Sequence, residues 1–403
     1  MKTTESFITA IMDGIGKDEA LALLAPERRE GLHDRAHEVT SLLDKAGAAP
    51  RALTHRELVD ILDWPDADAL FAAAYKVKCR EIGRCVSFRG LVEFGNVCEK
   101  DCYYCGIRKG NGKVHRYCMD AEEIVREAEW AFKAGYGSLV LQSGELTGEK
   151  NAAFVEDVLR RIHAFGGDDF GVTISLGEQS EETYRRWREA GAHRYLLRIE
   201  TSNPKLYAKL HPADHSWERR RDCLRALRRC GYQVGSGVMA GLPGQTVDDL
   251  ASDIEFFASE DIDMIGMGPY IPHADTPLGK DAPWTPELRK ERLELGLRMI
   301  AATRLYLHDL NIAAATALQA LDPEGREKGL LAGANVIMPN ITETRYRADY
   351  QLYAGKPCLT ESSSLCRGCL ERRIAAIGET ILWNKRGDSP HWGRKWEKVD
   401  FKS

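Results

Sequence analysis

The stretch Gly90–Cys105 reads GLVEFGNVCEKDCYYC and is the most informative segment of this 403-residue chain. Its first five residues, GLVEF, predict a short buried strand. Cys98, Cys102 and Cys105 follow within eight residues, a spacing that indicates metal binding or redox chemistry. We therefore expect a strand whose following loop carries the chemistry of the protein.

Further β-rich runs follow this strand and alternate with amphipathic stretches typical of helices. Such alternation predicts βα units and a parallel sheet. Eight strands with seven crossovers match the (β/α)8 TIM barrel, whose active site lies at the carboxyl ends of the strands. A doubly wound open sheet is the main alternative. The eight predicted strands are Gly90–Phe94, Ser138–Gln142, Gly171–Leu176, Arg194–Glu200, Gln233–Met239, Ile262–Gly268, Asn311–Thr316 and Ala334–Met338.

The chain divides into three predicted segments. Residues 1–85 form an N-terminal helical extension, in which Thr54 caps a helix and Glu57 follows three residues later. Residues 86–345 form the barrel. Residues 346–403 are a C-terminal segment with another cysteine motif, and the Trp- and Lys-rich end of this tail is expected to wrap the surface.

Composition excludes several classes of protein. The chain is 43% hydrophobic with a net charge of −5, which favours a globular protein and gives no electrostatic reason to expect a nucleic-acid or membrane partner. The start of the sequence lacks a basic segment followed by an apolar one. Eleven cysteines are too few for a disulfide scaffold. We expect a cytoplasmic protein.

The three cysteines of the first loop could each bind one iron of a [4Fe–4S] cluster. The fourth iron then has no local cysteine, and an open coordination position is what a catalytic cluster requires. A zinc site, or a structural cluster completed by a distant cysteine, remains an alternative at this point.

Other strand ends carry polar residues. Arg198 and Glu200 lie two residues apart and project to one face, which in a barrel can be the lumen. They would hold a ligand there or form an internal salt bridge.

Gly235–Ala240 formally matches a dinucleotide-binding fingerprint, but no helix opens at its third position. We reject that interpretation and expect Thr246 to cap the next helix.

The pattern CX3CX2C, with the aromatic Tyr104 before its last cysteine, resembles the radical S-adenosylmethionine (SAM) superfamily. That resemblance implies a [4Fe–4S] cluster whose unique iron binds the amino and carboxylate groups of SAM. Longer stretches, among them NVCEKDCYYCGIR, LVLQSGE, RYLLRIETSNP and GANVIMPN, resemble the HydE family of [FeFe]-hydrogenase maturases. The resemblance covers roughly residues 85–395.

The family resemblance implies roles for individual residues. Cys98, Cys102 and Cys105 would bind the cluster, and the catalytic residues of the substrate cavity would be Arg198, Tyr350 and Thr173. Arg220 and Arg221 are expected on the solvated face of a helix. The cofactor-binding residues would be Tyr104, Gln142, Ser143, Gly144, Glu145, Glu200, Arg219, Met239, Leu242, Thr316 and Met338.

Cys358, Cys366 and Cys369 form CX7CX2C, which resembles a second cluster site that some HydE proteins carry and others lack. Its chemistry need not be essential. Three thiolates and one water would also suit zinc.

Two departures from the HydE pattern bear on the substrate. Ile199 replaces a histidine, and Ala315 replaces the first of two threonines. The alternatives are a radical SAM enzyme for an organic substrate, similar to methylornithine synthase or biotin synthase, and an iron–sulfur scaffold without turnover. The resemblance implies an external one-electron reductant, a small-molecule or organometallic substrate and other hydrogenase maturases as partners.

Overall fold

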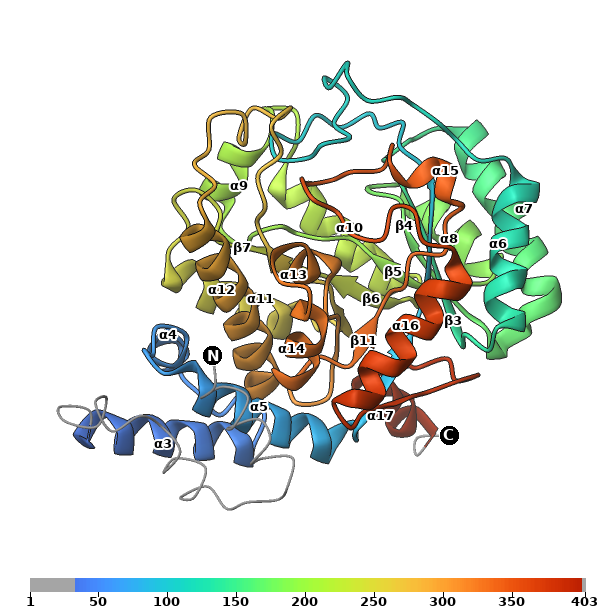
Figure 1. Ribbon diagram of the computed structural model, residues 1–403. Helices are drawn as coiled ribbons and strands as arrows, with labels where there is room; N and C mark the ends of the chain where they lie inside the picture. The colour runs from blue at the N-terminus through green and yellow to red at the C-terminus, as the bar shows by residue number, and fades with distance from the viewer. Residues whose placement is uncertain (1–32, 401–403) are drawn as a thin grey trace.

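The computed structural model describes residues 33–400, and it describes the side chains of residues 39–395 (Figure 1). The part of the predicted N-terminal extension before His33 lies outside the described residues.

Parallel strands form a closed ring within the described chain. Seven of them make one sheet in the order β10-β8-β6-β5-β4-β3-β2. Strand β11 joins both edges through bridges between Ala313 and Val336 and between Leu91 and Asn340. The ring confirms the (β/α)8 barrel over the open sheet. Its strands are β2 (Gly90–Gly95), β3 (Ser138–Ser143), β4 (Gly171–Ser175), β5 (Ala192–Leu196), β6 (Gln233–Ser236), β8 (Met264–Ile265), β10 (Asn311–Ile312) and β11 (Val336–Ile337).

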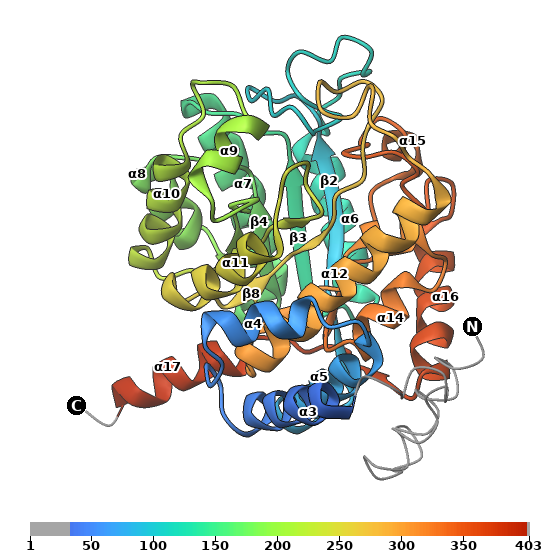
Figure 2. The same ribbon diagram turned by 90° about the vertical axis from the view of Figure 1, so that its left-hand side faces the viewer.

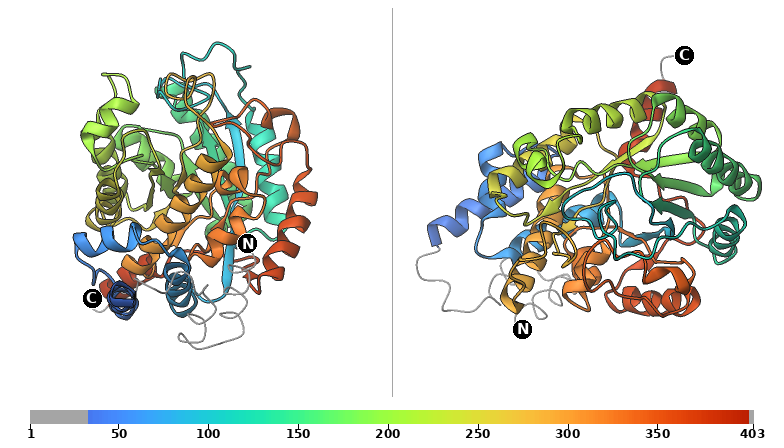
Figure 3. Two further views of the ribbon diagram at one scale, coloured as in Figure 1. Left: turned by 60° about the vertical axis from the view of Figure 1, so that its left-hand side comes forward. Right: turned by 90° about the horizontal axis from the view of Figure 1, so that it is seen from above.

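Helices between the strands surround the ring (Figure 3). Capping boxes start two of them, at Asp120 with Glu123 and at Thr246 with Asp249, so the predicted Thr246 cap is confirmed. The main helices are α6 (Ala121–Lys133), α7 (Glu149–Gly166), α8 (Glu181–Glu189), α10 (Trp217–Arg229), α11 (Val247–Ser259), α12 (Pro286–Tyr306) and α14 (Gly325–Leu331). Shorter ones are α9 (Pro204–Leu210), α13 (Thr316–Leu321) and α15 (Thr344–Arg347).

The described part of the N-terminal extension is helical, with α3 (His33–Ala48), α4 (His55–Leu62) and α5 (Ala67–Glu81). Thr54 and Glu57 form the predicted capping box at the start of α4. Lys78 of α5 and Glu379 form an ion pair in which both side chains are fully buried. The helices lie at the end of the barrel opposite the cysteine loop (Figures 1 and 2).

The C-terminal segment closes the amino end of the barrel. It contains α16 (Ser363–Ala376), β12 (Thr380–Ile381) and α17 (Pro390–Asp400), and β12 pairs with β1 (Cys85–Phe88). Arg194 Nη2 donates hydrogen bonds to Arg386 O (2.6 Å) and Asp388 Oδ1, and Arg89 Nη2 donates to Gly387 O (3.1 Å). Beyond the expected wrapping of the surface, the tail supplies acceptors that the buried barrel arginines need.

None of the described helices combines the length and the apolar character that a membrane span requires.

Candidate functional site

The cysteine loop follows β2 at the carboxyl end of the barrel, where the fold predicts chemistry. Backbone hydrogen bonds fix it to three other segments: Glu99 N to Glu145 O (2.8 Å), Tyr103 N to Leu210 O (2.9 Å) and Gly106 N to Leu352 O (2.9 Å). Segments far apart in the sequence thus hold the loop in one conformation.

Cys98, Cys102 and Cys105 are free thiols, each partly exposed to solvent. Burial raises the pKa of Cys102 to about 12, although the Arg220 charge lowers it, and the Cys98 sulfur is close enough to raise it further. Burial also raises the pKa of Cys105, with both other cysteines acting in the same direction. Three neighbouring thiols that resist ionisation need a cationic centre before they become thiolate ligands.

The donor set fits a [4Fe–4S] cluster. Each thiolate of such a cluster binds a different iron, so the three sulfurs need not converge on one point. Among the described residues, no three His, Cys, Asp or Glu side chains form a group that could hold a single metal ion. The buried Arg198 Nε has no hydrogen-bond partner, and Glu200 Oε2 has only an ion pair with Arg198 Nη2, which leaves polar capacity beside the loop for a ligand.

The loop after β3, Ser143–Glu145, packs directly on the cysteine loop. A Cβ atom at Gly144 would lie 2.2 Å from Val97 O and 2.9 Å from Cys98 Cβ, so only glycine fits. The Glu145 N–H donates to Cys98 Sγ over 3.3 Å. The predicted cofactor residues Ser143, Gly144 and Glu145 therefore lie beside the predicted cluster ligands.

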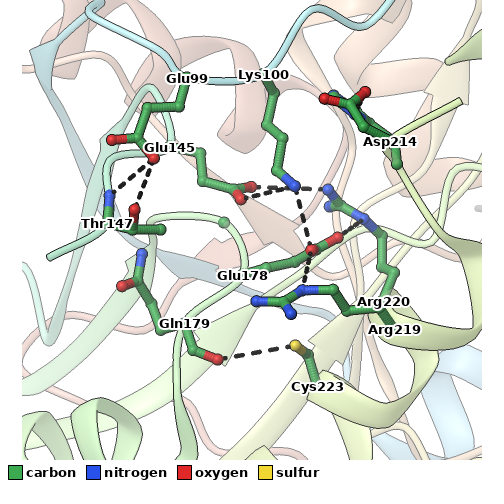
Figure 4. A network of polar contacts seen from close by, with 12 residues as sticks. Glu99, Lys100, Glu145, Thr147, Glu178, Gln179, Asp214, Arg219, Arg220 and Cys223 are labelled. Carbon is green, nitrogen blue, oxygen red and sulfur yellow. Dashed lines mark hydrogen bonds and ion pairs between the residues drawn. The ribbon is translucent and has the colours of Figure 1, made fainter. Parts of the chain in front are cut away.

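A network of charges connects Glu145 to the cysteine loop (Figure 4). Lys100, between the first two cysteines, lies 3.3 Å from both Glu145 Oε1 and Glu178 Oε2. Burial raises the pKa of Glu145 against the lowering effect of Arg220 and Lys100. Burial also acts on Glu178, but the charges of Arg220 and Lys100 outweigh it and lower the pKa of that carboxyl.

Two neighbouring arginines of α10 meet the same carboxylate. Arg219 Nε donates to Glu178 Oε2 over 3.1 Å, although the Arg219 side chain is 63% exposed. Arg220 is buried, and its Nε lies 3.0 Å from Glu178 Oε1 without hydrogen-bond alignment. The expectation that Arg220 lies on the solvated face was wrong, because the inner face of α10 begins at this residue.

Arg198 and Glu200 share a face as predicted and form an ion pair of 3.0 Å. Strand β5 ends at Leu196, earlier than expected, and Glu200 adopts φ +68°. This left-handed conformation is uncommon for a non-glycine residue and is typical of functional sites. Ile199 is fully buried in the main hydrophobic core.

An apolar cluster lies beside the cysteine loop. Leu242 belongs to its buried core, and Tyr104 and Met239 pack against that core, so three predicted cofactor residues meet here. The Tyr104 hydroxyl lies 3.2 Å from His211 Nε2, and the other ring nitrogen of His211 lies 2.9 Å from the Tyr207 carbonyl. Because Nδ1 must donate to that carbonyl, Nε2 accepts from Tyr104.

The remaining predicted cavity residues come from strands β3 and β4 and from the segments that follow β10 and β11. Gln142 Nε2 donates to the Tyr350 hydroxyl over 3.1 Å, which joins two of them. Thr173 is fully buried, and its hydroxyl has no partner. Thr316 Oγ1 accepts from Arg326 over 3.2 Å, and Met338 is half-buried after β11.

The structure adds residues that the sequence interpretation missed. Lys356 and Glu93 form a buried ion pair of 2.6 Å beside Tyr350, whose carbonyl also accepts from Lys356. Glu178 follows β4 and could have been found by applying the strand-end rule to that strand. No sequence pattern marked Lys100 as a functional residue, apart from its position between two of the cysteines.

The second cysteine motif lies on the C-terminal segment, outside the network around Glu145. Cys358 adopts φ +62°, Cys366 is buried on α16, and Cys369 is exposed on the same helix. A hydrogen bond with the Cys366 thiol lowers the pKa of Cys358, so these two of the three predicted ligands are neighbours.

Comparison with known proteins agrees with this site. The family model of the radical SAM superfamily matches residues 92–257. The chain is 45% identical over 323 residues to the [FeFe] hydrogenase maturase subunit HydE of Thermotoga maritima, covering 80% of this chain and 89% of that protein. It is a radical SAM enzyme. Within that superfamily, the chain belongs to the HydE family.

More distant relatives share the fold. The chain is 28% identical over 301 residues to 3-methylornithine synthase of Methanosarcina acetivorans, covering 73% of this chain and 81% of that protein. A crystal structure of methylornithine synthase matches with a TM-score of 0.71 at 23% identity and covers 89% of this chain and 99% of that one. The barrel is thus common to enzymes with different substrates.

Proposed function

We propose that this protein is a HydE-type maturase that uses SAM to help assemble the organometallic cluster of [FeFe]-hydrogenase. The observation that carries the proposal is the convergence of the cysteine loop, Glu145 and the Arg198–Glu200 pair at one end of the barrel. Membership of the HydE family supports the choice of substrate class.

In this proposal Cys98, Cys102 and Cys105 hold a [4Fe–4S] cluster that, when bound, supplies an electron for reductive cleavage of SAM to a 5′-deoxyadenosyl radical. Glu145, Glu200 and Arg219 hold the polar groups of SAM. Tyr104, Met239 and Leu242 pack against its adenine and exclude water.

The substrate binds deeper in the lumen. Thr173, with its free hydroxyl, and the Gln142–Tyr350 pair supply polar contacts, and Arg198 supplies positive charge. Ser143, Gly144, Thr316 and Met338 complete the wall at the strand ends. A small anionic iron complex delivered by a partner maturase suits this lining, because a guanidinium binds anions through charge-assisted hydrogen bonds.

Cys358, Cys366 and Cys369 are proposed to hold a second iron–sulfur cluster that is not required for SAM cleavage. The contact between Cys358 and Cys366 supports a shared ligand. An external one-electron donor and the other hydrogenase maturases complete the set of partners, and the reducing cytoplasm suits the free thiols.

The test is a maturation mixture that lacks its own HydE. Protein reconstituted without oxygen should restore hydrogenase activity, and Cys102→Ala should not. Vigorous SAM cleavage without restored hydrogenase activity would contradict the proposed substrate and favour an organic one, as in 3-methylornithine synthase. An absence of 5′-deoxyadenosine under reducing conditions would instead favour an iron–sulfur carrier.

A further inference from the structure

Glu178 is the most deeply buried carboxylate of the charge network at the barrel mouth, with a side chain only 2% exposed. Its Oε2 accepts hydrogen bonds from Arg219 and Lys100, and its Oε1 is ion-paired with Arg220 without an aligned hydrogen bond. Oε1 lies 3.0 Å from Arg220 Nε, and Oε2 lies 3.1 Å from Arg219 Nε and 3.3 Å from Lys100 Nζ. A carboxylate surrounded by three cations has little capacity left for a ligand.

Glu145 shares Lys100 with Glu178 at the same distance and meets Arg220 at a longer one. Lys100 Nζ lies 3.3 Å from its Oε1, and Arg220 Nη2 lies 3.7 Å from its Oε2, beyond hydrogen-bond distance. The charge of Glu145 is thus compensated less closely than that of Glu178.

The position of Glu145 also depends on Gly177. This glycine has φ +74°, and a Cβ atom there would lie 2.0 Å from Glu145 Oε2. A side chain at position 177 would displace the Glu145 carboxylate, and Glu178 shares Lys100 and Arg220 with Glu145 (Figure 4).

The network contains three positive groups and two negative ones. They are Lys100, Arg219 and Arg220, and Glu145 and Glu178. If Glu178 lost its charge, Lys100 and Arg220 would have Glu145 as their remaining carboxylate partner in the network. An incoming ammonium group would then meet a carboxylate that is already neutralised. The charge of Glu178 therefore decides how strongly Glu145 can attract a cation.

We infer that Glu178 is a positioning residue: by binding Lys100 and Arg220 it keeps the Glu145 carboxylate available for the ammonium group of SAM. The Lys100 ammonium group would compete with that of SAM for Glu145, and its ion pair with Glu178 limits this competition. This inference rests on the proposed role of Glu145 and extends it to residues that no comparison assigns.

The test measures the SAM dissociation constant by titration calorimetry on reconstituted, unreduced protein, together with iron content and thermal unfolding. Glu178→Gln should weaken SAM binding by about tenfold or more while the iron content stays unchanged. Adding Lys100→Met to that variant should restore most of the affinity, because the competing cation is gone. Glu181→Gln is the matched control, since Glu181 pairs with Arg229 on the exposed surface.

Three outcomes would overturn the inference. They are unchanged SAM affinity in Glu178→Gln, failure of the Lys100→Met change to restore affinity, and a loss of affinity that only follows a lower unfolding temperature. If Glu178→Gln does not fold, Lys100→Met alone decides: tighter SAM binding supports the inference, and unchanged or weaker binding contradicts it. Glu145→Gln separates the two proposals, because unchanged SAM affinity in that variant would refute the role of Glu145 itself.

Discussion

The two ends of the barrel treat buried charge in opposite ways. At the amino end, Arg194 is fully buried and donates hydrogen bonds to Ser138, Gln233, Arg386 O and Asp388, which leaves no nitrogen of the group free. At the carboxyl end, Arg198 Nε has no hydrogen-bond partner, and Glu200 Oε2 has only the 3.0 Å ion pair with Arg198 Nη2. The chain thus supplies every acceptor for Arg194 and leaves atoms of the Arg198–Glu200 pair for the proposed ligand.

The largest effect is expected at the carboxyl end. Cys102→Ser should abolish formation of 5′-deoxyadenosine and remove the iron of the first cluster, because a three-cysteine site has no spare ligand. The unfolding temperature of the metal-free protein should stay near that of the parent chain. Product analysis after anaerobic reduction, iron counting and calorimetry measure the three quantities, with Cys230→Ser as the control. Full turnover in Cys102→Ser would remove the contrast between the ends.

The amino end should respond in stability rather than in chemistry. Asp388→Ala leaves the buried Arg194 without its carboxylate, and breaking such a pair costs about 3–5 kcal/mol. SAM cleavage per folded molecule should be unchanged. Denaturant unfolding compared with the exposed Asp169→Ala variant tests this expectation. A large loss of specific activity in Asp388→Ala would show that the two ends are coupled.

The same end should also respond to pH. His391 lies between Asp261 Oδ1 (2.8 Å) and Asp309 Oδ2 (3.1 Å); burial lowers its pKa, but these hydrogen bonds outweigh burial and raise it to about 8. The stabilisation is complete below the unfolded value near 6.5 and is lost as pH rises through 8, a change of about 1–2 kcal/mol. Unfolding of the parent and His391→Gln at pH 6 and pH 9 should converge at the higher pH. An equal gap at both values would contradict this.

The smallest effect on turnover is expected at the second cysteine motif. Cys369→Ser should reduce the iron content of reconstituted protein while SAM cleavage stays within a factor of about two, since the residue is exposed and outside the barrel mouth. Iron content that equals that of the parent chain would show that Cys369 is not a ligand.

Local patterns were enough to predict much of this structure. The cysteine spacing predicted the loop that carries the proposed site, and the alternation of strands and helices predicted the barrel. Thr54 and Thr246 predicted where two helices begin. Two features depend on long-range contacts and left no local signal. Adjacent Arg219 and Arg220 look alike in the sequence, and only the packing of α10 on Glu178 buries one of them. Two of the four acceptors for Arg194, Arg386 O and Asp388 Oδ1, come from a segment that pattern analysis placed on the surface.

The pairing of Arg194 with Asp388 has a consequence for the order of folding. The two residues are 194 positions apart, so the contact cannot exist until synthesis has passed far beyond the last barrel strand. A nascent ring would have to hold this guanidinium, and that of Arg89, without the carbonyls of Arg386 and Gly387. Such distant pairings slow folding. We therefore expect the newborn barrel to stay loosely organised until the final helix region leaves the ribosome.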